Sequence, residues 1–167
     1  TASRAATIFV ATNGSDSFAG TNWTTAVATI TQGVAKASAG DTVLVGPGTY
    51  SAAVEINKAI TLRSQLGRAR TVIDRAGAGG RCVLVSATNA LLRGFSITGG
   101  KTNTGSAVGG GVHLKGYGSR IEGCYVWGNE ATNGFGGGVC MEGYGASVLG
   151  CVVYSNRADQ GGGISTD

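Results

Sequence analysis

The chain is poor in acidic residues: it has nine Asp and Glu among 167 residues, together with one histidine, His113, and one proline, Pro47. So few carboxylates leave little material for a clustered Ca²⁺ site, or for the pair of facing carboxylates that a glycosidase uses. Charged residues amount to 13% and hydrophobic residues to 42%. This balance excludes a disordered chain, because disordered chains are rich in charge and poor in apolar side chains.

Other sparse features exclude further classes of function. The net charge is +4, and the densest basic stretch, Arg63 to Arg75, has no interleaved aromatic residue, so we expect no nucleic-acid partner. The longest apolar runs, such as Cys82–Val85, are too short to cross a bilayer, so we expect no membrane span. The four cysteines show no C-x-x-C spacing, which argues against zinc and against thioredoxin-like chemistry.

Glycine is abundant, with 31 residues, and it recurs at a fixed period. Gly-Gly-Gly-Val occupies 109–112 and 136–139, and Gly-Gly-Gly-Ile occupies 161–164, so the copies lie 27 and then 25 residues apart. Other identities keep the spacing of 27, among them Tyr117/Tyr144, Cys124/Cys151, Val126/Val153 and Asn129/Asn156. A fixed period in the twenties indicates stacked supersecondary units.

A coil of about 27 residues with two or three strands is too short for a propeller blade, and it lacks the helix of a leucine-rich repeat. The sequence therefore predicts an all-β fold, a parallel β-helix or solenoid. We expect one domain over 1–167, with an N-terminal cap over 1–40 and coils over 41–167. The C-terminal end of the solenoid is expected to be uncapped.

The cap is expected to contain a strand at 7–11 and a helix at 23–39 that ends at Gly40 and covers the open end of the first coil. Residues 46–50 read as a turn. Short strands separated by turns of Gly, Asn, Ser and Asp are expected at 41–45, 54–56, 60–63, 71–74, 82–85, 91–98, 112–114, 119–127, 139–141 and 147–154.

The repeat also assigns faces to the strands. The positions expected to point inward are Leu92, Phe95, Ile97, Val112, Leu114, Ile121, Cys124, Val126, Val139, Met141, Val148, Cys151, Val153 and Ile164. The glycine triplets are expected where the backbone turns tightly or packs against the next coil.

Outward aromatic side chains are the main candidates for a binding surface. Tyr125, Trp127 and Tyr154 are expected on the outer wall, stacked from one coil to the next. Sugar rings pack against such faces, and so do protein partners, and the sequence leaves both alternatives open.

Two inward pairs are expected to be structural. Asn129 and Asn156 should form an asparagine ladder that bonds to the backbone at a turn. Cys124 and Cys151 should stack as reduced thiols in the core. A disulfide between them is the alternative, but adjacent in-register positions give it poor geometry.

No catalytic residue and no metal ligand is predicted. His113 aligns with Leu84 and Cys140, and we expect His113 and Cys140 to point outward one coil apart. A nucleophilic thiol needs a pocket and an oxyanion site, which a flat solenoid wall does not offer, so this pair is interpreted as surface decoration. Glu142 aligns with Lys115, which predicts a surface ion pair.

Two stretches resemble known families. The segments 9–16 (Phe-Val-Ala-Thr-Asn-Gly-Ser-Asp) and 40–50 (Gly-Asp-Thr-Val-Leu-Val-Gly-Pro-Gly-Thr-Tyr) lie within residues 8–62, which resemble the cap and first coil of secreted pectate-lyase-like proteins. This resemblance implies a right-handed β-helix and polysaccharide cleavage. In many lyases of that fold a Lys or Arg base acts with Ca²⁺ held by Asp and Glu.

The second resemblance lies in residues 109–164, which are similar to the repeats of chlamydial-type polymorphic outer-membrane proteins. The matching elements are 126–129 (Val-Trp-Gly-Asn) before 136–139, and 153–156 (Val-Tyr-Ser-Asn) before 161–164. Val stands here where that family prefers Phe, and Gly where it has Ala. This resemblance implies a secreted or surface-displayed β-helix used for adhesion.

We therefore expect a non-catalytic extracellular or cell-surface protein, structural or adhesin-like, without a cofactor. Self-association through the solenoid ends would build head-to-tail filaments. A polysaccharide or a neighbouring surface is the other expected partner. The alternatives are a polysaccharide lyase or glycoside hydrolase of the pectate-lyase-like fold, with Ca²⁺ required only for the lyase, and a carbohydrate-binding module.

Overall fold

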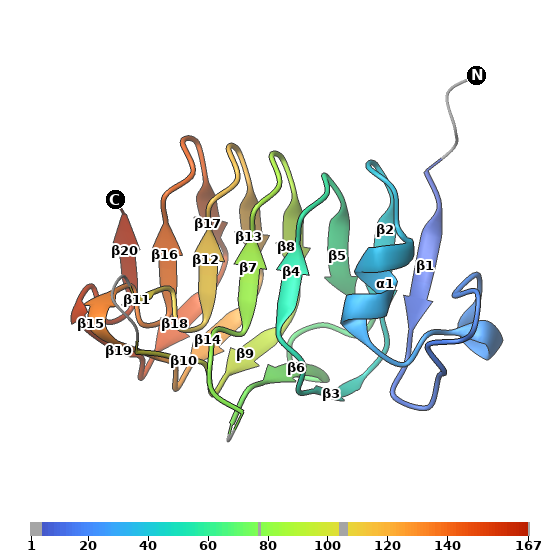
Figure 1. Cartoon of the computed structure of the whole chain (residues 1–167), viewed down its shortest axis with the longest axis horizontal. Coiled ribbons are helices and arrows are strands. Elements are labelled where there is room, and N and C mark those ends of the chain that lie inside the picture. The colour runs from blue at the N-terminus through green and yellow to red at the C-terminus, as the bar shows by residue number, and fades with distance from the viewer. Residues whose placement is uncertain (1–4, 77, 104–106, 167) are drawn as a thin grey trace.

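Parallel strands wind into a three-sided solenoid in the computed structural model, which describes residues 5–76, 78–103 and 107–166. Each side is one sheet, and successive coils add one strand to each (Figure 1). The first sheet contains, in spatial order, β1 (Thr7–Val10), β2 (Thr42–Val45), β5 (Thr61–Ser64), β8 (Leu91–Arg93), β13 (Arg120–Glu122) and β17 (Ser147–Leu149). The fold predicted from the sequence, a right-handed parallel β-helix with a capping strand and helix, is confirmed.

Two further sheets form the other two sides of the solenoid. The second sheet contains β3 (Gly48–Tyr50), β6 (Thr71–Asp74), β9 (Ser96–Thr98), β14 (Tyr125–Trp127) and β18 (Val152–Tyr154). The third sheet contains β4 (Val54–Ile56), β7 (Val83–Val85), β12 (Val112–Leu114), β16 (Val139–Met141) and β20 (Ile164–Thr166).

A smaller set of strands, the corner sheet, lies where the chain passes from the second sheet to the third. It contains β10 (Lys101–Thr102), β11 (Ala107–Val108), β15 (Glu130–Phe135) and β19 (Arg157–Gln160). None of these four strands was predicted. Figure 1 shows them gathered at one corner of the solenoid, next to β12, β16 and β20.

The predicted inward columns are confirmed by the register. Val112 pairs with Val139, which pairs with Ile164, and Val126 lies between Ile97 and Val153. Buried inward residues form one continuous core, which includes Leu92, Phe95, Ile97, Val112, Leu114, Ile121, Cys124, Val126 and Val139. In the last coil Met141, Val148, Cys151 and Val153 are only partly buried against that core.

Three of the predicted strands are each divided in two. The stretches 91–98, 119–127 and 147–154 bend from the first sheet into the second at Gly94, Gly123 and Gly150, whose φ values are +78°, +57° and +58°. Glycine adopts these values without the steric penalty that a Cβ brings. The segment expected as a turn at 46–50 also contributes β3.

Glycine triplets occupy the corner that leads into the third sheet. Gly109 and Gly136 open two of them with φ values of +58° and +61°. A Cβ on Gly138 would lie 2.5 Å from the carbonyl oxygen of Gly163 on the next coil. As predicted, these positions combine a tight turn with close packing between coils.

The predicted helix at 23–39 is wrong in extent. A 3₁₀ turn covers Trp23–Thr25, and α1 covers only Ile30–Lys36. Between them Val27 pairs with Val10 in a parallel bridge, so the middle of the segment extends the wall of the first coil. The apolar residues at helical spacing that suggested a longer helix are instead buried by packing against β1.

The helix α1 covers the core at the N-terminal end. It contacts β1, β2 and β4, and Ile30 and Val34 are buried (Figure 1). Gly33 allows the close approach, because a Cβ there would lie 2.7 Å from Val10 Cγ2 and 2.9 Å from Val43 Cγ1. The helix therefore stands beside β4 where a further strand of the third sheet would otherwise lie.

Candidate functional site

The outer face of the second sheet carries an aromatic pair. The register places Trp127 beside Tyr154, and on its other side beside Thr98. The two rings are stacked, with centroids 6.2 Å apart and an interplanar angle of 14°. Trp127 is 38% exposed and Tyr154 47% exposed. The two parallel rings thus form an apolar aromatic platform that is partly exposed to solvent.

Tyr125, the third predicted contact residue, is placed differently. It is half-buried, and the guanidinium of Arg68 lies 4.0 Å from its ring centroid, within the range of a cation–π contact. The same guanidinium donates a hydrogen bond of 3.1 Å to the carbonyl of Gly150. Arg68 therefore covers a face of the Tyr125 ring, and the open platform consists of Trp127 and Tyr154.

The side chains of Asn129 and Asn156 hold this face from inside. Asn129 Nδ2 donates to the carbonyls of Ile97 and Trp127, both at 3.0 Å, and Asn129 Oδ1 accepts from Gly100 N–H at 2.9 Å. Asn156 Oδ1 accepts from Asn129 Nδ2 and from the Asn129 backbone N–H, both at 3.0 Å. The bonds run directly from one coil to the next, behind the aromatic pair.

Cys124 and Cys151 lie on adjacent coils as thiols. The Cys124 backbone N–H donates to Cys151 Sγ at 3.3 Å. A hydrogen bond from the Cys124 side chain lowers the pKa of the Cys151 thiol, and the same contact, together with burial, raises the pKa of the Cys124 thiol. Cys151 is thus the more acidic thiol of the two.

A polar cluster that the sequence did not predict lies on the third sheet. The register joins Leu84, His113 and Cys140 in one outward row, as the repeat implied. His113 and Cys140 are nevertheless buried, so the expectation that they decorate the surface is wrong. His113 Nε2 lies 2.9 Å from Glu142 Oε2, where the sequence suggested that Glu142 would pair with Lys115.

The corner sheet and Arg81 account for this burial. Val108 and Phe135, from β11 and β15, line a small cavity with Cys140. Arg81 Nε donates to the carbonyls of Val108 and Gly109, at 3.1 and 3.0 Å. Burial lowers the pKa of Arg81, and burial followed by the nearby Arg81 charge lowers the pKa of His113.

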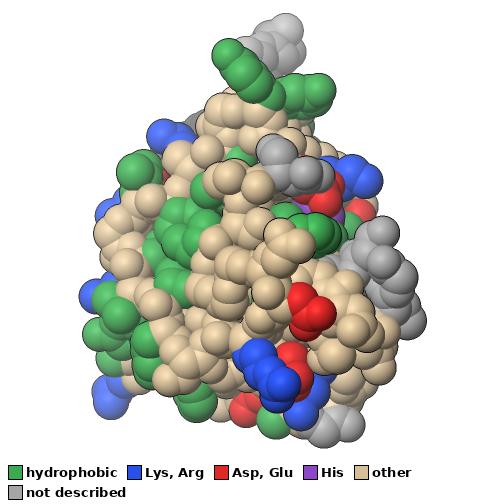
Figure 2. Space-filling model, turned by 90° about the vertical axis from the view of Figure 1, so that its left-hand side faces the viewer, with side chains coloured by type: hydrophobic (Ala, Val, Ile, Leu, Met, Phe, Trp, Pro, Cys, Tyr) green, Lys and Arg blue, Asp and Glu red, His purple; other side chains and the backbone are tan. Residues whose placement is uncertain are grey.

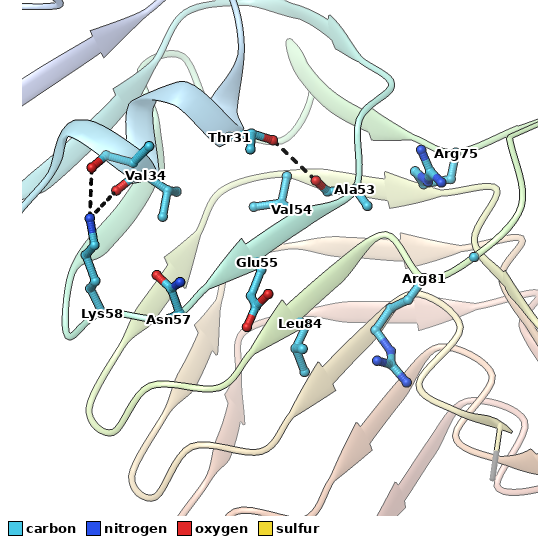
Figure 3. Close-up of a pocket in the computed structure, with 12 residues that line it drawn as sticks. Thr31, Val34, Ala53, Val54, Glu55, Asn57, Lys58, Arg75, Arg81 and Leu84 are labelled. Carbon is cyan, nitrogen blue, oxygen red and sulfur yellow. Dashed lines mark hydrogen bonds between the residues drawn. The ribbon is translucent and has the colours of Figure 1, made fainter.

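A groove of about 560 Å³ lies between α1 and the outer side of β4 and β7 (Figure 3). Lys58 Nζ donates to the carbonyls of Val34, Ala35 and Ala37 at the end of the helix, so it acts as a structural cap. Among the described residues that line the groove, Glu55 is the one carboxylate, and it accepts from the Ser86 hydroxyl at 3.1 Å. A glycosidase pair of carboxylates is not assembled in this groove.

Of the helices among the described residues, none has the length and apolarity needed to cross a membrane.

Comparison with known proteins supports the fold. No protein-family model matches the chain. The cell surface glycoprotein of Methanothermus fervidus is 28% identical over 96 residues, which are 58% of this chain and 14% of that protein. The matched stretch is therefore a small part of its relative.

Solved structures with a similar fold include carbohydrate-active proteins. Pectin methylesterase PemA from Erwinia chrysanthemi has a TM-score of 0.57 at 15% identity, and a pectin methylesterase in complex with a hexasaccharide has 0.55 at 15%. In both cases 95% of this chain covers 56% of the other. A rhamnogalacturonan lyase has a TM-score of 0.58 at 17% identity, with 93% of this chain covering 53% of it. These likenesses establish the parallel β-helix fold, whereas the resemblance to polymorphic outer-membrane proteins stays a prediction.

Proposed function

We propose that this chain is a non-catalytic, surface-displayed or secreted β-helix that binds polysaccharide on the outer face of its second sheet. The observation that carries the proposal is the stacked pair Trp127 and Tyr154, whose rings are nearly parallel and partly exposed to solvent. The apolar faces of sugar rings pack on such platforms, and a rigid aromatic pair loses little entropy when it binds.

The charge beside this face favours an acidic polysaccharide. Arg63 and Arg93 are adjacent in the first sheet and line a shallow cavity of about 380 Å³ at the corner that leads into the second sheet. Arg68 stands over Tyr125 at the same corner. Guanidinium groups bind carboxylates well, so uronate residues suit this combination of aromatic face and arginine corner.

The names of similar proteins support a surface location and a polysaccharide ligand for this proposal. A relative of part of the chain is named as a cell surface glycoprotein, and proteins of the same fold act on pectin or rhamnogalacturonan. The absence of catalysis is our proposal, and the scarcity of carboxylates in the sequence supports it. The rival function, a polysaccharide lyase or hydrolase, predicts release of unsaturated or reducing sugars from pectin or alginate. A lyase would in addition lose that activity when Ca²⁺ is chelated.

Binding should be measured by calorimetry with oligogalacturonate as the probe. Trp127→Ala is expected to weaken binding by roughly tenfold or more, because a central aromatic contributes much of a small interface. Trp23→Ala is a matched control, since Trp23 is also 38% exposed but packs against Phe9 in the cap. Equal affinities of the two variants would refute the proposed face.

Self-association is a second proposal for the same molecule. Figure 2 looks onto the end formed by the last coil, where hydrophobic side chains are visible. Leu149, Val152 and Ile164, on β17, β18 and β20, are 41–48% exposed. Pairing of this end with another copy would produce concentration-dependent sedimentation that Val152→Lys reduces. A single monomeric species at every concentration would contradict it.

A further inference from the structure

Three side chains of different chemistry meet beneath the corner sheet. His113 on β12, Cys140 on β16 and Glu142 just after β16 each offer one ligand atom, and these atoms all lie within 4.8 Å of one another. His113 and Cys140 are neighbours because the repeat pairs β12 with β16 in register. Glu142 follows two residues after Cys140, on the same outward side of the strand.

The environment of the His113 imidazole is a second, independent indication of a bound ligand. The His113 side chain is only 7% exposed, and neither ring nitrogen makes an aligned hydrogen bond. The contact from Nε2 to Glu142 Oε2 is short, at 2.9 Å, but it does not have hydrogen-bond geometry. A buried polar group without an aligned partner costs free energy. An ion coordinated by His113 Nε2 would remove that cost.

We propose that His113 Nε2, Cys140 Sγ and a carboxylate oxygen of Glu142 bind one Zn²⁺ ion, with a fourth position left for water or another small ligand. Imidazole, thiolate and carboxylate are the three ligand types of protein zinc sites, and three of them with an open position is a common arrangement. Tetrahedral bonds of about 2.0–2.3 Å place ligand atoms roughly 3.3–3.8 Å apart. Side-chain rotations that move the ligand atoms by about 1 Å would bring them from their present separations to that spacing.

The charges balance in a simple way. Zn²⁺ displaces the thiol proton of Cys140 to solvent, so thiolate and carboxylate together neutralise the ion. Arg81 opposes a cation, but its guanidinium is held by the carbonyls of Val108 and Gly109. Lys115, also a cation on this side of the strand, is exposed and solvated.

Access to the site comes from two directions. The Glu142 side chain is 27% exposed, so the carboxylate reaches solvent directly. Cys140 also lines a cavity of about 260 Å³ together with Gln160, Ser165 and Thr166. These polar groups can hold the water that would complete the coordination.

The test uses Co²⁺ in place of Zn²⁺, because Co²⁺ reports thiolate ligation by absorption. Chelator-treated protein of the full 167 residues is titrated with Co²⁺, and one equivalent should produce a thiolate-to-cobalt charge-transfer band that Zn²⁺ then removes. Cys140→Ser should abolish the band. Cys151→Ser is the control and should keep it, since Cys151 lies between β17 and β18, outside the third sheet, and packs partly buried against the core.

Glu142→Gln guards against a folding artefact, because Glu142 is half-exposed. This variant should keep the charge-transfer band but bind the metal about tenfold or more weakly. His113 is the only histidine of the chain, so its ring ¹⁵N signals are unambiguous and should shift on addition of Zn²⁺. An unchanged ¹⁵N spectrum, a missing band in the folded wild-type protein, or the same band in Cys140→Ser would overturn the proposal.

Discussion

Asn129 Nδ2 donates a hydrogen bond of 3.0 Å to the carbonyl of Trp127, two residues before it. The buried Asn129 amide thereby fixes the backbone at the exposed aromatic platform. Its hydrogen bond to Asn156 Oδ1 links this backbone to the next coil. The rigidity of the outer face thus originates in the interior of the solenoid.

This relationship predicts a large difference between two similar substitutions. Asn129→Ala should lower the free energy of unfolding by about 2–4 kcal/mol, because several buried backbone groups lose their partner. Asn156→Ala should cost less, since Asn156 is half-exposed and water can replace its bonds. Urea denaturation of both variants checks the order. A larger loss for Asn156→Ala would show that the ladder is not built as described.

The glycine corners predict a second contrast. Gly138→Ala should destabilise the chain by about 2 kcal/mol or more, because its Cβ would meet the Gly163 carbonyl oxygen at 2.5 Å. Gly163→Ala, at the equivalent repeat position, would meet only Val153 Cγ1 at 3.8 Å and should be nearly neutral. Thermal melts of the two variants test this, and equal melting temperatures would argue against close packing of the coils.

The cap predicts a pH-dependent effect. Asp41 accepts hydrogen bonds from the backbone N–H groups of Ala6, at 2.7 Å, and Ser38, at 2.8 Å, and these bonds lower its pKa below the usual 3.8. The ionised carboxylate therefore stabilises the fold fully above the unfolded-state pKa, and this contribution is lost as the pH falls through the lower folded-state pKa.

Asp41→Asn should consequently reduce the free energy of unfolding by about 1 kcal/mol at pH 7. The difference from wild type should shrink as the pH falls below the usual range of an aspartate, provided that both proteins remain folded. Chemical denaturation at several pH values measures it. A difference that grows on acidification would have the wrong sign for this account.

The coupled thiols predict selective alkylation. Cys151 should react with iodoacetamide at neutral pH well before Cys124, because its pKa is lowered and it is less buried. Cys124→Ala removes the hydrogen bond that favours the Cys151 thiolate, so the midpoint of the pH–rate profile should rise. Peptide mass spectrometry quantifies both sites. Faster labelling of Cys124 would contradict the assignment.

Much of the fold was predictable because the repeat is regular. The spacing of 27 residues identified columns such as Val126 and Val153, which the register confirms. Alternation of side chains then separated core from surface. The division of strands at Gly123 was missed, since glycine within an apolar run is compatible with either a strand or a bend.

The polar cluster could not be predicted in the same way. The repeat did place His113 beside Cys140 and on the outward side of the strand. Their burial depends on β15, whose sequence Glu-Ala-Thr-Asn-Gly-Phe lacks the apolar alternation of a strand. Its partner β10 lies in a coil of different length, so the repeat gave no alignment for the covering layer.

The most direct test of the central proposal, polysaccharide binding on the second sheet, uses the fluorescence of Trp127. Trp23→Phe leaves Trp127 as the only tryptophan of the chain. Titration of this variant with oligogalacturonate should change the Trp127 emission saturably, with the affinity that calorimetry finds for the wild-type protein. Calorimetric binding with an unchanged Trp127 signal would place the polysaccharide elsewhere, and no binding of any acidic polysaccharide would contradict the proposed function.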